Sequence, residues 1–134
     1  MPKYNLTWDI TDAKLLEALL LASGEEGGAP LPEVLLMADA VDGTVLTHAE
    51  VEQGLEKLMS VGYVTIKKNK LLLAPAFLKD YESIDGAEDE QQALGQLLQT
   101  KELHAENFDE PKILIKKYKL KKQYQAYLEQ FGGE

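Results

Sequence analysis

The sequence predicts a mostly α-helical fold with one small β-hairpin, followed by a helical extension. Apolar residues recur at helical spacing in three segments before residue 62, which predicts three helices. Two short apolar runs then flank a lysine-rich turn, which predicts the hairpin. An acidic stretch begins at residue 80. We therefore place a first domain at residues 9–84, and an acidic linker with two further helices at residues 85–134.

The first two helices are bounded by typical helix-start and helix-stop residues. Thr11 or Asp12 can cap the first helix. The apolar face of this helix contains Leu15, Leu16, Leu19 and Ala22. Glycine and proline residues between positions 24 and 30 end it. Pro32 fits the first turn of a second helix, which runs to about residue 40.

The third helix has the clearest start in the sequence. Thr47 can cap it, and Glu50 stands three residues later, which is the spacing of a capping box. Gly62 follows the end of the helix, where glycine is common. The predicted inward positions are Val51, Leu55 and Leu58, and the predicted outward positions are Ala49, Gln53, Glu56 and Ser60.

The hairpin and a short helix complete the first domain. Residues 63–66 and 71–73 are typical of two strands, and the sequence Lys-Lys-Asn-Lys at residues 67–70 predicts a tight polar turn between them. Three apolar residues spaced four and three apart predict a short helix that folds back onto the domain: Phe77, Tyr81 and Ile84.

This order of elements resembles the winged helix-turn-helix domain of bacterial transcriptional regulators of the MarR and PadR type, over about residues 9–81. The local sequence is similar too. Gly-Tyr-Val at residues 62–64 follows a recognition-like helix and opens the wing, and Leu-Ala-Pro at residues 73–75 stands where these families often have Leu-Thr-Pro. The resemblance implies double-stranded DNA as the partner, with the third helix in the major groove and the wing on the flanking backbone.

The resemblance places candidate DNA contacts on the third helix and on the wing. They are Thr47, His48, Gln53 and Lys57 on the helix, and Lys67, Lys68, Asn69 and Lys70 on the wing. The lysines of the last helix are expected to help the wing: Lys116, Lys117, Lys119, Lys121 and Lys122.

The charge pattern argues against the third helix as a DNA-reading element. The net charge of the chain is −9, arginine is absent, and Glu50, Glu52 and Glu56 make the outer face of this helix acidic. An acidic face repels phosphate, and arginine is the usual bidentate reader of guanine. Because one fold carries several functions, the alternative is a winged-helix protein-interaction module that does not bind DNA and whose acidic third helix meets a basic protein partner.

The extension combines an acidic segment with a basic one. Residues 80–110 contain 1 Lys against 10 acidic residues, whereas residues 111–134 contain 6 Lys against 2. We expect one helix over residues 88–105 and a second over residues 111–131. The second helix carries an apolar seam of Ile113, Leu120, Tyr124, Tyr127 and Phe131. Regulators of the resembled families commonly dimerise through such helices, so the resemblance implies a homodimer. The alternative is that both helices pack on their own domain.

The sequence does not contain the residue patterns that metal sites, cofactor sites and enzymes need. The chain has no cysteine, and His48 and His104 lie far apart, so we expect no metal site and no cofactor. No phosphate-cradling glycine motif follows a predicted strand, so we do not expect an enzyme. Without a leader-like start or a long apolar run, we expect a cytoplasmic protein that is not in a membrane.

Overall fold

The computed structural model describes residues 7–23, 28–42, 46–67, 70–84, 86 and 88–131. Within these residues it contains seven α-helices, one 3-10 helix and a small antiparallel sheet, so the prediction of a mostly helical fold with a hairpin is confirmed. The elements are α1 (Ile10–Ser23), β1 (Gly28–Ala29), α2 (Leu31–Asp42), α3 (His48–Ser60), β2 (Val64–Lys67), β3 (Lys70–Leu73), α4 (Pro75–Tyr81), α5 (Glu90–Gln99), η1 (Ala105–Asn107), α6 (Asp109–Tyr118) and α7 (Leu120–Phe131).

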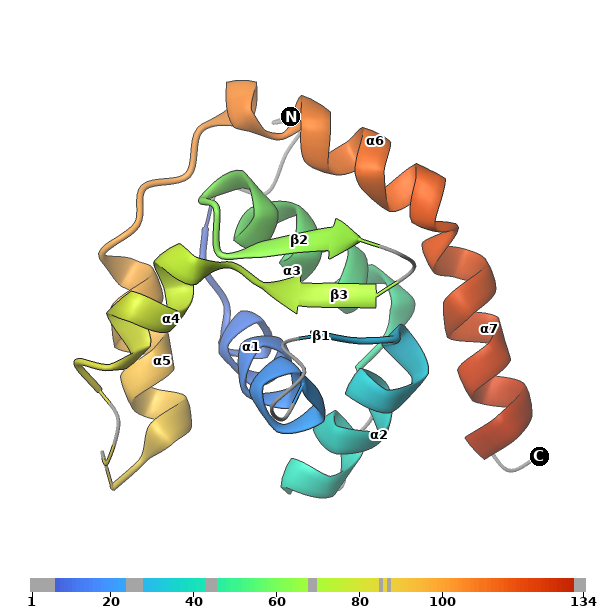
Figure 1. Cartoon of the computed structure of the whole chain (residues 1–134), viewed down its shortest axis with the longest axis horizontal. Helices are drawn as coiled ribbons and strands as arrows, with labels where there is room; N and C mark the ends of the chain where they lie inside the picture. Colours follow the sequence, from blue (N-terminus) through green and yellow to red (C-terminus); the bar gives the residue numbers. More distant parts are fainter. Residues whose placement is uncertain are drawn as a thin grey trace.

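The helices surround a central sheet. In Figure 1, α4 and α5 lie on one side of the sheet, and α6 and α7 run along the opposite side. None of the helices in the described part of the chain has the length and apolar character needed to cross a lipid bilayer.

The hairpin gains a third strand that the sequence analysis does not predict. β1 pairs antiparallel with β3, so the strand order is β1–β3–β2. A Cβ atom at Gly28 would lie 2.8 Å from Cγ of Leu72, so the close approach of β1 to β3 requires glycine. A strand of two residues in a glycine-rich loop shows no alternation of side chains, and therefore gives no sequence signal.

The core is built around α1. This helix contacts α2, α3 and α5, and its Leu15, Leu16 and Leu19 side chains are fully buried. The predicted inward residues of α3 are also fully buried, and the predicted capping box of this helix is present. Both predictions for α3 are confirmed.

The extension packs onto the first part of the chain. α5 lies against α1, α6 against α3, and α7 against α2. Leu94 of α5, Ile115 of α6 and Tyr127 of α7 belong to the same hydrophobic cluster as the residues of α1. The helix predicted over residues 88–105 is shorter in the structure, where α5 ends at Gln99.

The prediction of a single last helix is wrong. Lys119 adopts a left-handed backbone conformation, with φ 60° and ψ 53°, and separates α6 from α7. Tyr118, the last residue of α6, is 3% exposed, and its hydroxyl oxygen accepts a hydrogen bond of 2.9 Å from the backbone N–H of Leu31. The break redirects the chain so that α7 packs on α2. Lysine is not a typical helix-breaking residue, so the sequence contains no sign of this turn.

Candidate nucleic-acid interface

The first turn of α3 is held by its own side chains. The Thr47 hydroxyl oxygen accepts a hydrogen bond from the Glu50 backbone N–H at 3.1 Å, and Glu50 Oε1 accepts one from the Thr47 backbone N–H at 2.8 Å. Together they satisfy two backbone donors that a helix start otherwise leaves unpaired. Thr47 is exposed, but its side chain already serves the helix.

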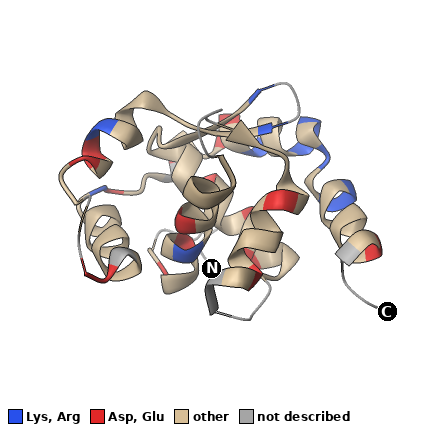
Figure 2. Cartoon of the chain, turned by 60° about the horizontal axis from the view of Figure 1, so that its bottom comes forward, with Lys and Arg blue, Asp and Glu red and all other residues tan. Residues whose placement is uncertain are grey.

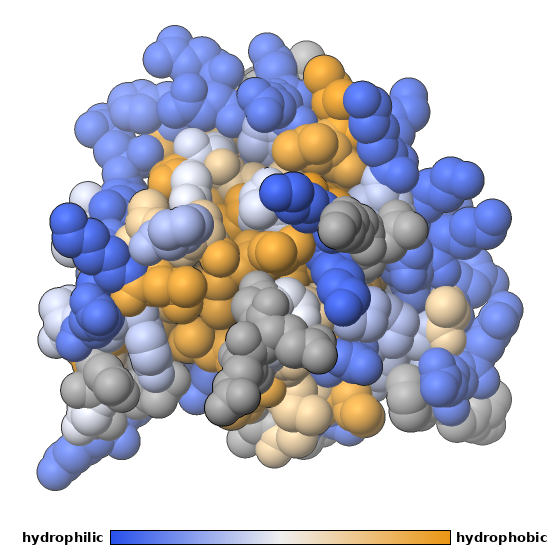
Figure 3. Space-filling view, viewed as in Figure 1, coloured by the Kyte–Doolittle hydropathy of each residue, from blue (hydrophilic) through white to orange (hydrophobic). Residues whose placement is uncertain are grey.

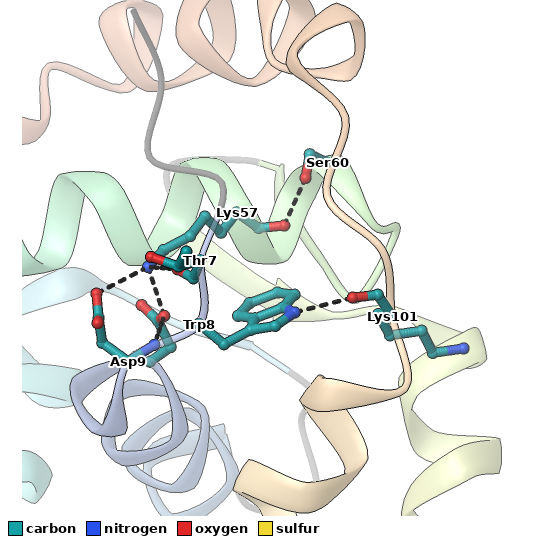
Figure 4. A network of polar contacts seen from close by, with 7 residues as sticks. Thr7, Trp8, Asp9, Lys57, Ser60 and Lys101 are labelled. Carbon is teal, nitrogen blue, oxygen red and sulfur yellow. Dashed lines mark hydrogen bonds and ion pairs between the residues drawn. The ribbon is translucent and has the colours of Figure 1, made fainter. Parts of the chain in front are cut away.

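Lys57 is not on the surface, and the expectation that it contacts DNA is wrong. Its side chain is 1% exposed, and its Nζ forms ion pairs with Asp12 and, at 3.3 Å, with Asp9. It also donates a hydrogen bond of 2.9 Å to the Thr7 carbonyl oxygen. Figure 4 shows the ammonium group surrounded by these oxygens, where the chain enters α1. A lysine held in this way cannot reach a ligand.

The buried ion pair has a definite electrostatic character. Burial raises the pKa of the Asp12 carboxyl, and the neighbouring Lys57 ammonium opposes that shift. Asp12 Oδ2 also accepts a hydrogen bond of 2.8 Å from the backbone N–H of Asp9. The cluster therefore joins the start of α1 to the second half of α3. Its role is structural, because the side chains of Lys57 and Asp12 are both buried.

α6 covers the second half of the predicted outer face of α3. Glu56 is only 8% exposed, because Lys112 of α6 lies over it and donates a hydrogen bond of 2.8 Å to its Oε2. Ser60 donates to the Lys57 carbonyl oxygen of its own helix at 2.7 Å. The prediction that Glu56 points outward is wrong, since the sequence does not reveal the packing of α6 on α3.

His48 is turned toward α7. Its ring lies edge-on to Tyr124, with 5.7 Å between ring centroids, and its Nε2 is buried without a hydrogen-bond partner in the described part of the chain. Of the four candidate contacts on α3, only Thr47 and Gln53 are exposed. The accessible face of α3 therefore contains half-buried Glu50 and Glu52 beside exposed Ala49 and Gln53, and no lysine.

The wing is accessible where the structure describes it. Lys67 and Lys70 pair across the hairpin at the ends of β2 and β3, and both are exposed. Lys68 and Asn69, the other candidate contacts, lie outside the described residues.

The exposed lysines of the extension lie beside the wing. Figure 2 shows the basic segments at the hairpin tip and at the junction of α6 and α7 gathered at one end of the molecule, and Figure 1 places the same segments side by side. We call these exposed residues the lysine surface: Lys67, Lys70, Lys116, Lys117, Lys119, Lys121 and Lys122. Ammonium groups act as point charges toward phosphate, so this surface can hold a polyanion without reading its bases.

A groove of about 420 Å³ extends from the lysine surface toward α3. Lys116, Lys119 and Lys121 line one wall, and Glu52 and Glu56 line the other. The carboxylates limit how far an anionic ligand can enter. An anion therefore has its most favourable position on the outer side of α6 and α7, away from α3.

The predicted dimerisation seam is largely inside this chain. Leu120 and Tyr127 are each 3% exposed, and the Tyr124 hydroxyl donates a hydrogen bond of 2.7 Å to the Leu46 carbonyl oxygen. The burial of Leu120 and Tyr127 and the hydrogen bond of Tyr124 agree with the alternative prediction, in which the helices pack on their own domain. Ile113 is 55% exposed, and the Phe131 side chain lies outside the described residues. A homodimer stays a prediction, and Ile113 is the described seam residue that is available for it.

No family model, no curated protein and no solved structure matches this chain. The site is therefore described by its own chemistry. Among the described residues, no group of three or more histidine and carboxylate side chains is placed to hold a metal ion. The covering of α3 by α6 has no signal in the sequence, and the extension lysines are predicted only to help the wing. The signal for those lysines is the excess of 6 Lys over 2 acidic residues in residues 111–134.

Proposed function

We propose that this chain is a DNA-binding protein of the winged-helix type that holds the duplex through the lysine surface, and that α3 does not enter the major groove. The observation that carries the proposal is the gathering of seven exposed lysines at one end of a chain whose net charge is −9. The element order α1, β1, α2, α3, β2, β3, with strand order β1–β3–β2, supports the winged-helix assignment.

The electrostatics of the proposed complex set its salt dependence. Each phosphate that a lysine neutralises contributes about −0.9 to the slope of log affinity against log salt concentration. If all seven lysines of one chain contact phosphate, they contribute a slope of about −6. Because the accessible residues of α3 include no lysine and arginine is absent, we expect little discrimination between base sequences.

The test is a salt titration of binding to two fluorescent duplexes of unrelated sequence. We expect similar affinities for both, and a loss of binding as salt rises. Lys117→Glu should weaken binding and reduce the slope by about 0.9. Lys79→Glu is the matched control, because Lys79 is exposed on α4, on the opposite side of the sheet, and the charge change is the same. Equal losses for the two variants, or no binding by the wild type at low salt, contradict the proposal.

A protein-interaction module is the second candidate function. Figure 3 shows hydrophobic side chains gathered over the sheet in the centre of one face, a feature more typical of protein contacts than of a DNA interface. A separate feature is the accessible part of α3, which is acidic at Glu50 and Glu52. A basic protein partner would complement this acidic part of α3.

A photo-crosslinking residue tests this second candidate. Placed at Gln53, which is exposed on α3, it should give a discrete adduct in cells that is lost when Glu52, which is not part of the helix cap, is replaced by lysine. The same crosslinker at exposed Ala76 of α4 is the control. An adduct that is identical at both positions, or insensitive to the charge reversal, contradicts an interaction through α3.

A further inference from the structure

The turn between α6 and α7 contains a residue that does not suit its backbone conformation. Lys119 has φ 60° and ψ 53°, in the left-handed region, and among the described residues it is the only one other than glycine with a positive φ. A helix that ends in this conformation usually has glycine or asparagine there, because the Cβ of any other residue comes too close to a carbonyl oxygen. Lysine therefore destabilises this turn relative to glycine.

The neighbours of Lys119 prevent the turn from relaxing. Tyr118 and Leu120 are each 3% exposed, and the Tyr118 hydroxyl accepts a hydrogen bond of 2.9 Å from the Leu31 N–H. The backbone N–H of Lys119 donates to carbonyl oxygens of α6, and its carbonyl oxygen accepts a hydrogen bond of 3.0 Å from the Gln123 N–H. The backbone at position 119 is thus held from both sides, and the side chain starts from a fixed point.

Contacts within the chain do not explain a lysine at position 119. Its side chain is exposed, and within the part of the chain that the structure describes its ammonium has no hydrogen-bond or ion-pair partner. Lysines near the end of a helix can stabilise the helix dipole, but Lys116 and Lys117 already occupy the last turn of α6. The ammonium of Lys119 is therefore available to a ligand from outside the chain.

Lys119 lies where several ammonium groups meet. One wall of the groove beside α3 contains three lysines of the lysine surface: Lys116, Lys119 and Lys121. Of the two glutamates on the opposite wall, Glu56 is already paired with Lys112 at 2.8 Å, so Glu52 is the carboxylate that remains. Three ammonium groups against one carboxylate leave this wall positive, and an anion shared by several of them is held more strongly than by one.

We infer that Lys119 is the central phosphate contact of the lysine surface, and that together with Lys116 and Lys121 it binds one phosphodiester group of the duplex. This inference rests on the proposed function and adds a fixed anchor point to it. A side chain that starts from a rigid backbone loses less freedom on binding than one on a mobile segment. Removal of the lysine should therefore act in two opposite directions, because the protein becomes more stable while its affinity for the duplex falls.

The test measures stability and affinity on the same variants. Lys119→Gly and Lys119→Asn suit the left-handed conformation and remove the charge, so each should raise the melting temperature, by up to about 4 °C. Affinity for a fluorescent duplex at roughly 0.1 M salt should fall about eightfold, which is the contribution of one phosphate contact relative to 1 M salt. Lys119→Arg keeps the charge, and should match the wild type in both measurements.

Lys122→Gln is the matched control. Lys122 is exposed in α7 and belongs to the lysine surface, but it does not line the groove and has an ordinary helical backbone. This variant should lose no more than about threefold in affinity, because an ammonium that engages phosphate only part of the time contributes a fraction of a full contact. Its melting temperature should stay within about 2 °C of the wild type.

The possible failures are distinguishable. If the wild type binds the duplex and Lys119→Gly loses no more affinity than Lys122→Gln, the inference is wrong while the proposed function stands. A lower melting temperature for both Lys119→Gly and Lys119→Asn also overturns it, because the lysine then serves the end of α6. Weak binding by Lys119→Arg has the same consequence. No binding by the wild type at low salt contradicts the inference and the proposed function together.

Discussion

Replacing Lys57 by methionine tests how strongly the buried ion pair holds α3 against the start of α1. Methionine keeps the length of the side chain but removes the charge. Lys57 is 1% exposed and its partner Asp12 is 2% exposed at the side chain, so the substitution leaves a buried carboxylate without its counter-charge. Breaking a buried pair in this way costs about 3–5 kcal/mol. Asp9, with a side chain that is 53% exposed, contributes little to this cost because water solvates it.

The expected change in melting temperature follows from that free energy. For a chain of this size, 1 kcal/mol corresponds to roughly 4 °C, so Lys57→Met should melt about 12–20 °C below the wild type. The assay is thermal and urea unfolding followed by circular dichroism. The double variant Lys57→Met with Asp12→Leu should recover much of the loss, because apolar replacement of a whole buried pair is often close to neutral.

The pH dependence of Lys57→Met provides a second readout. Burial raises the pKa of Asp12 in the folded protein above its unfolded value, and the loss of Lys57 should raise it further. Between the unfolded and folded pKa values, the folded state then binds more protons than the unfolded state. The free energy of unfolding therefore rises as pH falls through the folded pKa. The variant should regain stability relative to the wild type on acidification. A deficit under about 1 kcal/mol that does not change with pH would refute the reasoning.

Three further predictions concern α3, the α6–α7 junction and the assembly. Thr47→Ala should lower the free energy of unfolding by about 0.5–2 kcal/mol in urea titrations, because it removes the cap oxygen that accepts the Glu50 N–H, and Thr47→Ser should restore it. Lys119→Gly should raise stability by up to about 1 kcal/mol, since Lys119 has φ 60°, whereas Lys119→Ala should not; a gain with alanine would contradict the strain argument. If the chain forms the homodimer that the family resemblance implies, Ile113→Glu should give a monomer in sedimentation velocity that is still folded by circular dichroism. A wild type that sediments as a monomer at high micromolar concentration contradicts the dimer.

Local signals in the sequence account for most of the elements in the first part of the chain. The capping box of α3 is predictable because Thr47 and Glu50 stand at a spacing that is typical of a helix start and precede an apolar helical stripe. The buried stripe of Val51, Leu55 and Leu58 follows from helical periodicity, and the hairpin from two apolar runs around a polar turn. The charge balance of the extension likewise shows that basic residues are concentrated there, without showing which surface they share with the rest of the chain.

The sequence by itself determined the helices before the hairpin, the hairpin, and the concentration of lysine after residue 111, since each depends on residues that are close together in the chain. Only the tertiary structure decided which polar residues are accessible. Glu56 is predicted to point outward from its helix and Lys57 to contact DNA, yet both are buried. Lys57 pairs with Asp12, about 45 positions away, and Glu56 with Lys112, about 56 positions away. The left-handed turn at Lys119 brings the extension lysines beside the wing and the aromatic residues of α7 into the core. Such placements depend on packing between distant segments, for which neither periodicity nor capping residues give a local signal.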